Sequence, residues 1–172
     1  MSTRPPPLFA KVLRERQTIR RFTGDPVALP IIQRIVAAAG RAPSAHNRQP
    51  WRFRVLRDTR SHTPITSAPV VMVVCLTLED MDAYQDRARA DAERTMAVQS
   101  TAMAGAHVLL AAEAEGLGAC WMCAPLFCPH EVRTAIALPA HWMPQGLVPL
   151  GYPGEPGKCR SRKPVSDILS FR

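Results

Sequence analysis

Apolar residues recur at helical spacing in several parts of the chain. A spacing of three and four residues, as in the segment Ile32–Ala39, places the apolar side chains on one face of a helix. This pattern predicts helices over about residues 8–14, from Pro30 up to Pro43, over 91–115 and over 131–136. Gly116 is placed to cap the third of these helices. Because that helix is apolar over much of its circumference, we expect it deep in the molecule or at a subunit interface.

Four segments have the pattern of β-strands. Residues 53–56 alternate between apolar and polar, whereas residues 70–76 form a continuous apolar run set off by Pro69. The continuous run is typical of a buried central strand. Residues 117–121 and 146–150 complete the predicted sheet. Helices and strands are intermixed without a regular βαβ rhythm, so the sequence predicts an α+β fold.

Length and composition favour one domain, residues 1–172. A chain of 172 residues that is 47% hydrophobic supports one sizeable core and hardly two. We expect residues 1–7 to be flexible and residues 155–172 to form a C-terminal arm. The longest apolar run is far shorter than the ~20 residues of a membrane span, so we predict no membrane association. Without a secretory signal pattern at the N-terminus, a cytoplasmic location is the expectation.

The net charge of +8 is unevenly distributed. Residues 1–60 contain 13 Lys and Arg against 3 Asp and Glu, residues 61–157 contain 4 against 10, and residues 158–172 contain 5 against 1. Two basic ends flanking an acidic middle are able to converge on an anion. Aromatic residues make up only 6% of the chain, and no nucleic-acid-reading motif is present. A small phosphorylated ligand is therefore favoured over nucleic acid, which we do not expect as a partner.

Two polar segments carry candidate chemistry. The first, Arg16–Phe22, has arginines that match phosphate oxygens, and in an extended chain Arg16, Thr18 and Arg20 share one face. Taken alone, it is also explained by a solvated basic turn. The second, Ala42–Trp51, is a loop between two prolines with amides that are able to pair with the edge of a heteroaromatic ring. Its alternative explanation is a turn that carries a packed tryptophan.

The five cysteines are odd in number and irregularly spaced, which favours reduced thiols. Cys120, Cys123 and Cys128 approach the spacing of metal ligands but lack a fourth ligand at a sensible distance. We therefore predict no metal.

The order and spacing of these motifs resemble the nitroreductase family. The run Arg16–Arg20 is similar to its Arg-x-Ser/Thr-x-Arg/Lys signature, and Pro43–Trp51 to its Pro-Ser-x-x-Asn-x-Gln-Pro-Trp signature. Further similar segments follow in order, namely residues 111–118, 147–153 and 160–164. The resemblance implies a mainly antiparallel sheet flanked by helices and an intertwined homodimer. It also implies one FMN in each of two sites at the subunit interface.

Specific residues carry the implied cofactor site. Within the resemblance, the phosphate and ribityl chain of FMN would be held by Arg16, Gln17, Thr18 and Arg20, completed by Arg160 and Arg162. The flavin would be approached from the partner subunit by Pro43, Ser44, Ala45 and Asn47, with Gln49 in the same loop, and along the ring by Met122, Ala124, Pro125 and Leu126. Substrate would contact His46 and Arg48, although His46 is equally well explained as an exposed loop residue. No side chain is needed as a nucleophile, because the flavin carries the hydride chemistry.

Residues 77–100 and 118–127 are most similar to a nitroreductase-like domain associated with the coenzyme F420:glutamyl ligase of F420 biosynthesis. The connection 56–68 is shorter than is usual there, which predicts an open pocket that accepts quinones or nitroaromatics broadly. The sequence thus predicts an FMN-dependent oxidoreductase that uses a reduced nicotinamide or an F420-type donor and a small organic acceptor. The alternatives are a reductase of a dehydro-F420 intermediate and a non-catalytic flavin- or F420-binding protein.

Overall fold

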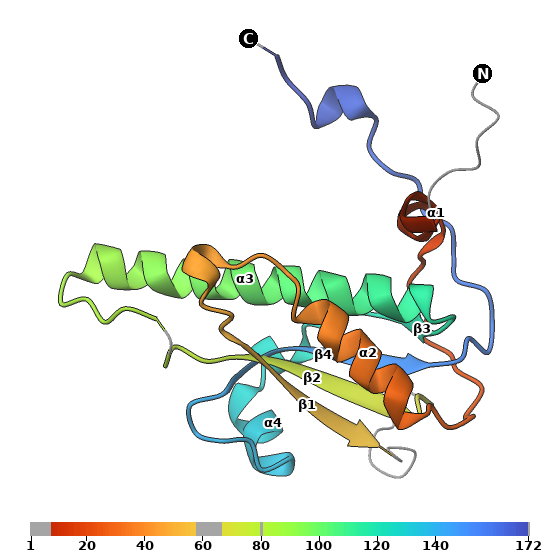
Figure 1. Ribbon diagram of the computed structural model, residues 1–172, viewed down its shortest axis with the longest axis horizontal. Coiled ribbons are helices and arrows are strands. Elements are labelled where there is room, and N and C mark those ends of the chain that lie inside the picture. Colours follow the sequence, from red (N-terminus) through yellow and green to blue (C-terminus); the bar gives the residue numbers. More distant parts are fainter. Residues whose placement is uncertain (1–7, 58–66, 80, 172) are drawn as a thin grey trace.

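Helices cover both faces of a four-stranded sheet in the computed structural model, which describes residues 8–57, 67–79 and 81–171 (Figure 1). The α-helices are α1 (Leu8–Glu15), α2 (Leu29–Ala39), α3 (Arg87–Ala114) and α4 (Pro129–Ala135). The strands are β1 (Trp51–Arg57), β2 (Val70–Leu76), β3 (Gly118–Ala119) and β4 (Met143–Gly151). They lie in the order β1-β2-β4-β3 with antiparallel neighbours. The predicted α+β class and antiparallel sheet are confirmed.

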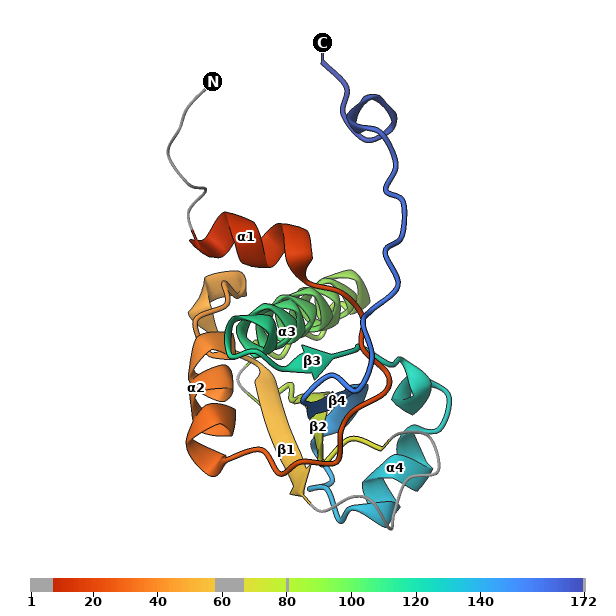
Figure 2. The ribbon, with the colours of Figure 1, turned by 90° about the vertical axis from the view of Figure 1, so that its right-hand side faces the viewer.

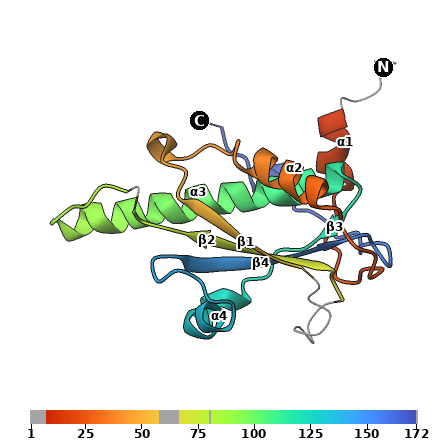
Figure 3. The same ribbon diagram turned by 60° about the horizontal axis from the view of Figure 1, so that its bottom comes forward.

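Strand β2 is the centre of the core, as the continuous apolar run predicts. All seven of its residues are buried. Val70, Met72 and Val74 belong to the larger core on the α2 and α3 side, whereas Val73 and Cys75 pack with residues on the α4 side. Figure 3 shows α2 and α3 on one face of the sheet and α4 on the other. Burial raises the pKa of the Cys75 thiol to about 12.

Helix α3 begins at Arg87, earlier than the predicted start at residue 91. Asp86 is its N-cap, and its side chain accepts a hydrogen bond of 2.9 Å from the backbone N–H of Arg89. The helix buries one face along its length, while Val98 and Met103 on other faces are exposed. Its end matches the prediction, because Gly116 adopts a φ of +75° just beyond it.

Strand β3 is shorter than the predicted segment 117–121, because Trp121 leaves the strand to pack between two glycines. A Cβ placed on Gly105 of α3 or on Gly146 of β4 would lie closer than 3.0 Å to carbons of the Trp121 ring. The indole therefore occupies the space that side chains at these two positions would need. It joins α3 to the sheet immediately before the segment 122–126.

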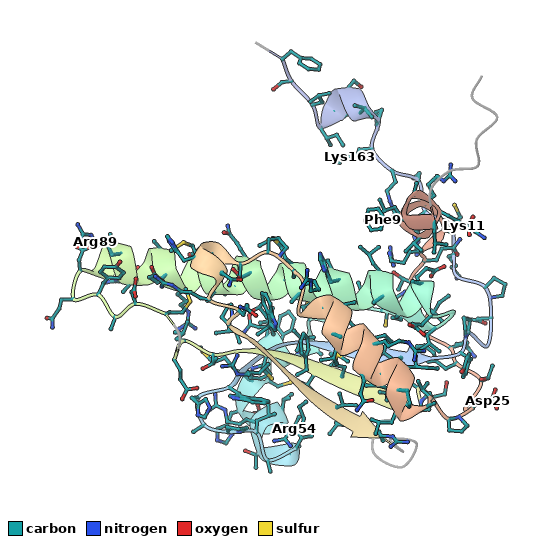
Figure 4. All side chains as sticks on the ribbon, in the orientation of Figure 1. Phe9, Lys11, Asp25, Arg54, Arg89 and Lys163 are labelled. Atoms are coloured by element: carbon teal, nitrogen blue, oxygen red, sulfur yellow. The ribbon has the colours of Figure 1, made fainter. Side chains whose placement is uncertain are left out.

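The two ends of the described chain lie on the same side of the molecule (Figure 2). Beyond Gly157, residues 158–171 are exposed and run past α1, away from the sheet. In Figure 4, Phe9 on α1 and Lys163 on this C-terminal segment both lie outside the body formed by sheet and helices. Residues 1–7, expected to be flexible, and residues 58–66, most of the short connection expected to leave the pocket open, lie outside the described residues.

The Trp121 packing predicts the effect of adding one methyl group. We expect Gly146→Ala to lower the free energy of unfolding by about 1–3 kcal/mol, because the new Cβ overlaps the indole within a packed core. Gly40→Ala is the control, since its Cβ meets atoms only at 3.4 Å and beyond and its φ of −63° suits alanine. Urea unfolding of both variants provides the measurement. Equal stability of the two variants would contradict the packing described here.

Candidate functional site

The first polar segment lies extended between strand β3 and the chain that follows β4. After α1 ends at Glu15, Thr18 pairs in parallel with Ala119, and the Ile19 N–H donates to the Ala119 carbonyl over 3.0 Å. Further along, the Thr23 N–H donates to the Tyr152 carbonyl over 3.0 Å. Backbone pairing at these two points thus holds the segment extended, the condition under which Arg16, Thr18 and Arg20 share one face.

Glycines allow this segment to approach its neighbours closely. A Cβ on Gly118 would lie 2.7 Å from Ile19, and a Cβ on Gly157 would lie 2.6 Å from the Cβ of Gln17. The close contact at Gly157 brings the C-terminal chain against the N-terminal one. The two basic ends of the sequence therefore converge in space.

A cavity of about 800 Å³ lies where the two ends meet. It is lined from the N-terminal side by Leu13, Arg14, Arg16, Gln17, Thr18, Ile19, Arg20 and Arg21 and from the C-terminal side by Glu155, Pro156, Gly157, Lys158, Cys159, Arg160 and Arg162. All the residues predicted to hold a phosphate are therefore in one place.

The cavity carries positive charge that the described residues do not neutralise. Glu155, the only carboxylate among the described residues that line it, lies 3.3 Å from Arg21. Among the described residues, Arg16, Arg20 and Arg160 form no ion pair, and the guanidinium of Arg162 donates only to the carbonyls of Arg160 and Ser161. Converging guanidinium groups without carboxylate partners are the arrangement that binds phosphate oxygens.

The second polar segment is a strained loop beside α3. Its residues His46, Asn47 and Gln49 have φ values of 51°, 55° and 50°, in the left-handed region that non-glycine residues rarely adopt. The Ser44 hydroxyl accepts a hydrogen bond of 3.1 Å from the Gln49 N–H, which closes the loop on itself. Left-handed non-glycine residues persist only when their surroundings fix them, and they gather at functional sites.

Helix α3 fixes this loop through polar residues that the sequence analysis missed. The Ser100 hydroxyl accepts a hydrogen bond of 3.2 Å from the Ala45 N–H. The guanidinium of Arg48 donates to Glu93 over 2.7 Å and also pairs with Asp82. Glu93 and Ser100 lie two helical turns apart on the buried face of α3. The sequence signal for this contact was the carboxylate of Glu93, which lies at helical spacing with alanines of the buried face.

The segment 122–126 forms a third group near the sheet. Met122 and Leu147 exchange backbone hydrogen bonds of 2.9 Å, after which Ala124–Leu126 makes one turn of 3-10 helix, η3. Pro125 is buried, whereas Leu126 and the following Phe127 are exposed.

The three groups are not joined into one site within a single chain. Of the residues predicted to contact the flavin or the substrate, the basic cavity excludes Pro43, Ser44, Ala45, His46, Asn47, Arg48, Gln49, Met122, Ala124, Pro125 and Leu126. The roles of these residues stay predictions, as do the roles of those that line the cavity.

The sequence matches the nitroreductase family in two overlapping segments, residues 13–67 and 60–152. An NADH dehydrogenase of Thermus thermophilus is 33% identical, with 92% of this chain and 93% of the relative covered. A protein of Methanothermobacter thermautotrophicus, named NADH dehydrogenase/NAD(P)H nitroreductase, is 32% identical, with coverage of 84% and 77%.

Solved structures share the fold over nearly the whole chain. A nitroreductase-type protein of Desulfovibrio desulfuricans, determined in complex with FMN, has a TM-score of 0.83 and 28% identity and covers 98% of each chain. A protein of Clostridium acetobutylicum described as an NADH oxidase has a TM-score of 0.75 and 26% identity, with coverage of 94% and 99%.

Fold and cavity together define an α+β protein with a basic cavity where the two ends of the chain meet. The chain belongs to the nitroreductase family, which is a family of flavin oxidoreductases. The predicted family and nitroreductase-like fold are confirmed, while the closer similarity to the F420-associated domain stays a prediction. Within residues 8–57, 67–79 and 81–171, no helix is both long and apolar enough to cross a membrane.

The strained loop predicts an unusual response to glycine. We expect His46→Gly to raise the free energy of unfolding by about 0.5–1 kcal/mol, because glycine adopts a positive φ without a steric cost. Ala45→Gly is the control, since Ala45 has no positive φ and should lose stability. Thermal unfolding of the two variants distinguishes them. A loss of stability in both would show that the loop is not strained at His46.

Proposed function

We propose that the protein is an FMN-dependent oxidoreductase that transfers a hydride from NAD(P)H to a small organic acceptor such as a quinone or a nitroaromatic compound. The observation that carries this proposal is the convergence of unpaired arginines from both ends of the chain on one cavity. Family membership and the FMN complex of the Desulfovibrio desulfuricans relative support the choice of cofactor.

The residues of the cavity fit the phosphate end of FMN. Arg16, Arg20 and Arg160 supply forked donors whose charge the described residues leave unpaired, which suits a dianionic phosphate. Thr18 adds a hydroxyl and Gln17 an amide for the ribityl chain. Arg162 lines the same cavity. FMN, when bound, supplies the hydride chemistry, so the chain's own task is to bind, orient and shield.

The remaining predicted residues are proposed to act from the partner subunit. Pro43, Ser44, Ala45, Asn47 and Gln49 would close over the ring with their strained loop, and residues 122–126 would run beside it. A homodimer of this kind is supported by large apolar side chains that a single chain leaves exposed on α1 and on the C-terminal segment, namely Leu8, Phe9, Leu13, Ile168, Leu169 and Phe171. Apolar surface of this extent is typical of an interface.

The electron donor is proposed from the relatives. The Thermus thermophilus and Methanothermobacter thermautotrophicus relatives are both named for reactions of NADH or NAD(P)H, which favours NADH or NADPH. A reduced F420-type donor, or a role as reductase of a dehydro-F420 intermediate, is the second candidate, supported by the sequence similarity of residues 77–100 and 118–127. A non-catalytic flavin-binding protein is the third.

Reduction of bound flavin tests the function directly. We expect the FMN-loaded protein to lose its yellow colour when NADH or NADPH is added without oxygen. A quinone should restore the colour, with one NAD(P)H and one proton converting one quinone to its hydroquinone. Bleaching by reduced F420 alone would support the second candidate instead. Bound flavin that no donor reduces would identify a binding protein.

Anchoring of the phosphate is tested with two flavins. We expect Arg16→Ala and Arg20→Ala each to weaken FMN binding by about tenfold to a hundredfold, since a hydrogen bond to a charged group contributes about 1.5–3 kcal/mol. Riboflavin, which has no phosphate, should lose little affinity. Arg34→Ala is the control, because Arg34 pairs with Glu115 outside the cavity. Equal losses for FMN and riboflavin in titration calorimetry would refute the assignment.

Dimerisation is tested by mass in solution. If two subunits share each flavin site, light scattering should give twice the chain mass even in dilute samples. A monomer that binds one FMN per chain with full affinity would contradict the shared site.

A further inference from the structure

Arg48 is held at the junction of the strained loop, helix α3 and the segment before that helix. Its side chain is only 16% exposed. One terminal nitrogen lies 2.7 Å from Glu93 of α3, and the other pairs with Asp82. Each terminal nitrogen of the guanidinium therefore pairs with a different carboxylate.

The two carboxylates differ in how firmly they are held. The Glu93 side chain is 8% exposed and comes from the buried face of a long helix, so removing it would leave a buried cation without a partner. The Asp82 side chain is 55% exposed and belongs to residues 81–86, which form neither helix nor strand. Water reaches the exposed Asp82 carboxylate, so its loss from the pair is less costly than loss of the buried Glu93 carboxylate. Asp82 is thus the exchangeable partner and Glu93 the permanent one.

Contacts with α3 would hold the Arg48 guanidinium in place if another carboxylate replaced that of Asp82. Ser100 holds Ala45 at one end of the loop, and Glu93 holds Arg48 itself. A substrate carboxylate in the place of Asp82 would leave the charge of the cluster unchanged and would meet a fork already oriented.

We propose that Arg48 is a carboxylate-binding residue whose resting partner is Asp82, and that the enzyme therefore favours acceptors that carry a carboxylate. This inference rests on the proposed function, which places the loop of Arg48 over the flavin. Glu93 is a positioning residue in this scheme, because it acts only through Arg48. Asp82 is an internal competitor that the substrate displaces.

Two acceptors of nearly the same shape test this proposal. Para-nitrobenzoate and para-nitrobenzamide differ mainly in charge, and the FMN-loaded protein is assayed with each as acceptor and NADH as donor. Reduction of either nitro group to nitroso consumes one NADH and one proton and releases one water. We expect a higher kcat/KM for the carboxylate. We also expect Asp82→Asn to raise the carboxylate-to-amide ratio by about fivefold, because the competing carboxylate is removed; this change corresponds to about 1 kcal/mol.

Matched variants separate a site from a general charge effect. Asp91→Asn removes the same charge from an exposed aspartate that pairs with Arg87 and does not contact Arg48. It should leave the ratio unchanged. Arg48→Lys keeps a cation beside Glu93 but loses the fork, and it should lower the ratio by about fivefold. A ratio that Asp82→Asn does not raise, or that Asp91→Asn raises equally, would overturn the proposal.

Direct binding distinguishes failure of this proposal from failure of the proposed function. Titration calorimetry of the FMN-loaded protein with para-nitrobenzoate should give a lower Kd in Asp82→Asn and a higher Kd in Arg48→Lys. That result without any nitro reduction would retain the carboxylate site and reject the oxidoreductase. Reduction of both acceptors with equal Kd values in all variants would retain the enzyme and reject the site.

Discussion

Close backbone approach at a few glycines is the constraint on which the rest of the structure depends. The extended segment that follows α1 fits between β3 and the C-terminal chain only because Gly118 and Gly157 leave space for Ile19 and Gln17. Trp121 likewise lies between Gly105 and Gly146, because neither glycine has a side chain that would overlap its ring. The N-terminal segment therefore extends one edge of the sheet, and its backbone pairing, rather than ion pairs, orients Arg16 and Arg20.

Helix α3 is a polar support as well as a wall of the core. Its buried face alternates small apolar residues, which let the sheet approach, with Glu93 and Ser100, which reach outward to the loop of residues 44–49. A loop with three left-handed residues would relax if it were exposed to water on all sides. The anchors at both ends of this loop explain why it keeps that conformation beside a rigid helix.

Local sequence patterns predicted much of the fold, whereas contacts between distant segments could be predicted only in part. Helix α2 and strand β2 follow their apolar periodicity closely, and Gly116 marks the end of α3. The start of α3 was placed too late because Asp86, its N-cap, precedes the apolar pattern. The convergence of the two basic ends could be predicted from the charge distribution, since both ends of the chain are rich in arginine. The pairing of Arg48 with Glu93 could not be predicted, because the two residues are 45 apart in the sequence. Their contact depends on how α3 is rotated and where it packs, which local patterns do not determine.

The two walls of the basic cavity are synthesised at different times. One wall consists of residues that emerge early, from Leu13 to Arg21, and the other of residues that emerge after β4, from Glu155 to Arg162. The sheet and its helices are complete before the second wall exists. A growing chain that has reached β4 therefore carries only the first, arginine-rich wall of the basic cavity. The complete cavity requires synthesis through Arg162 and folding of the sheet that separates the two walls in the sequence.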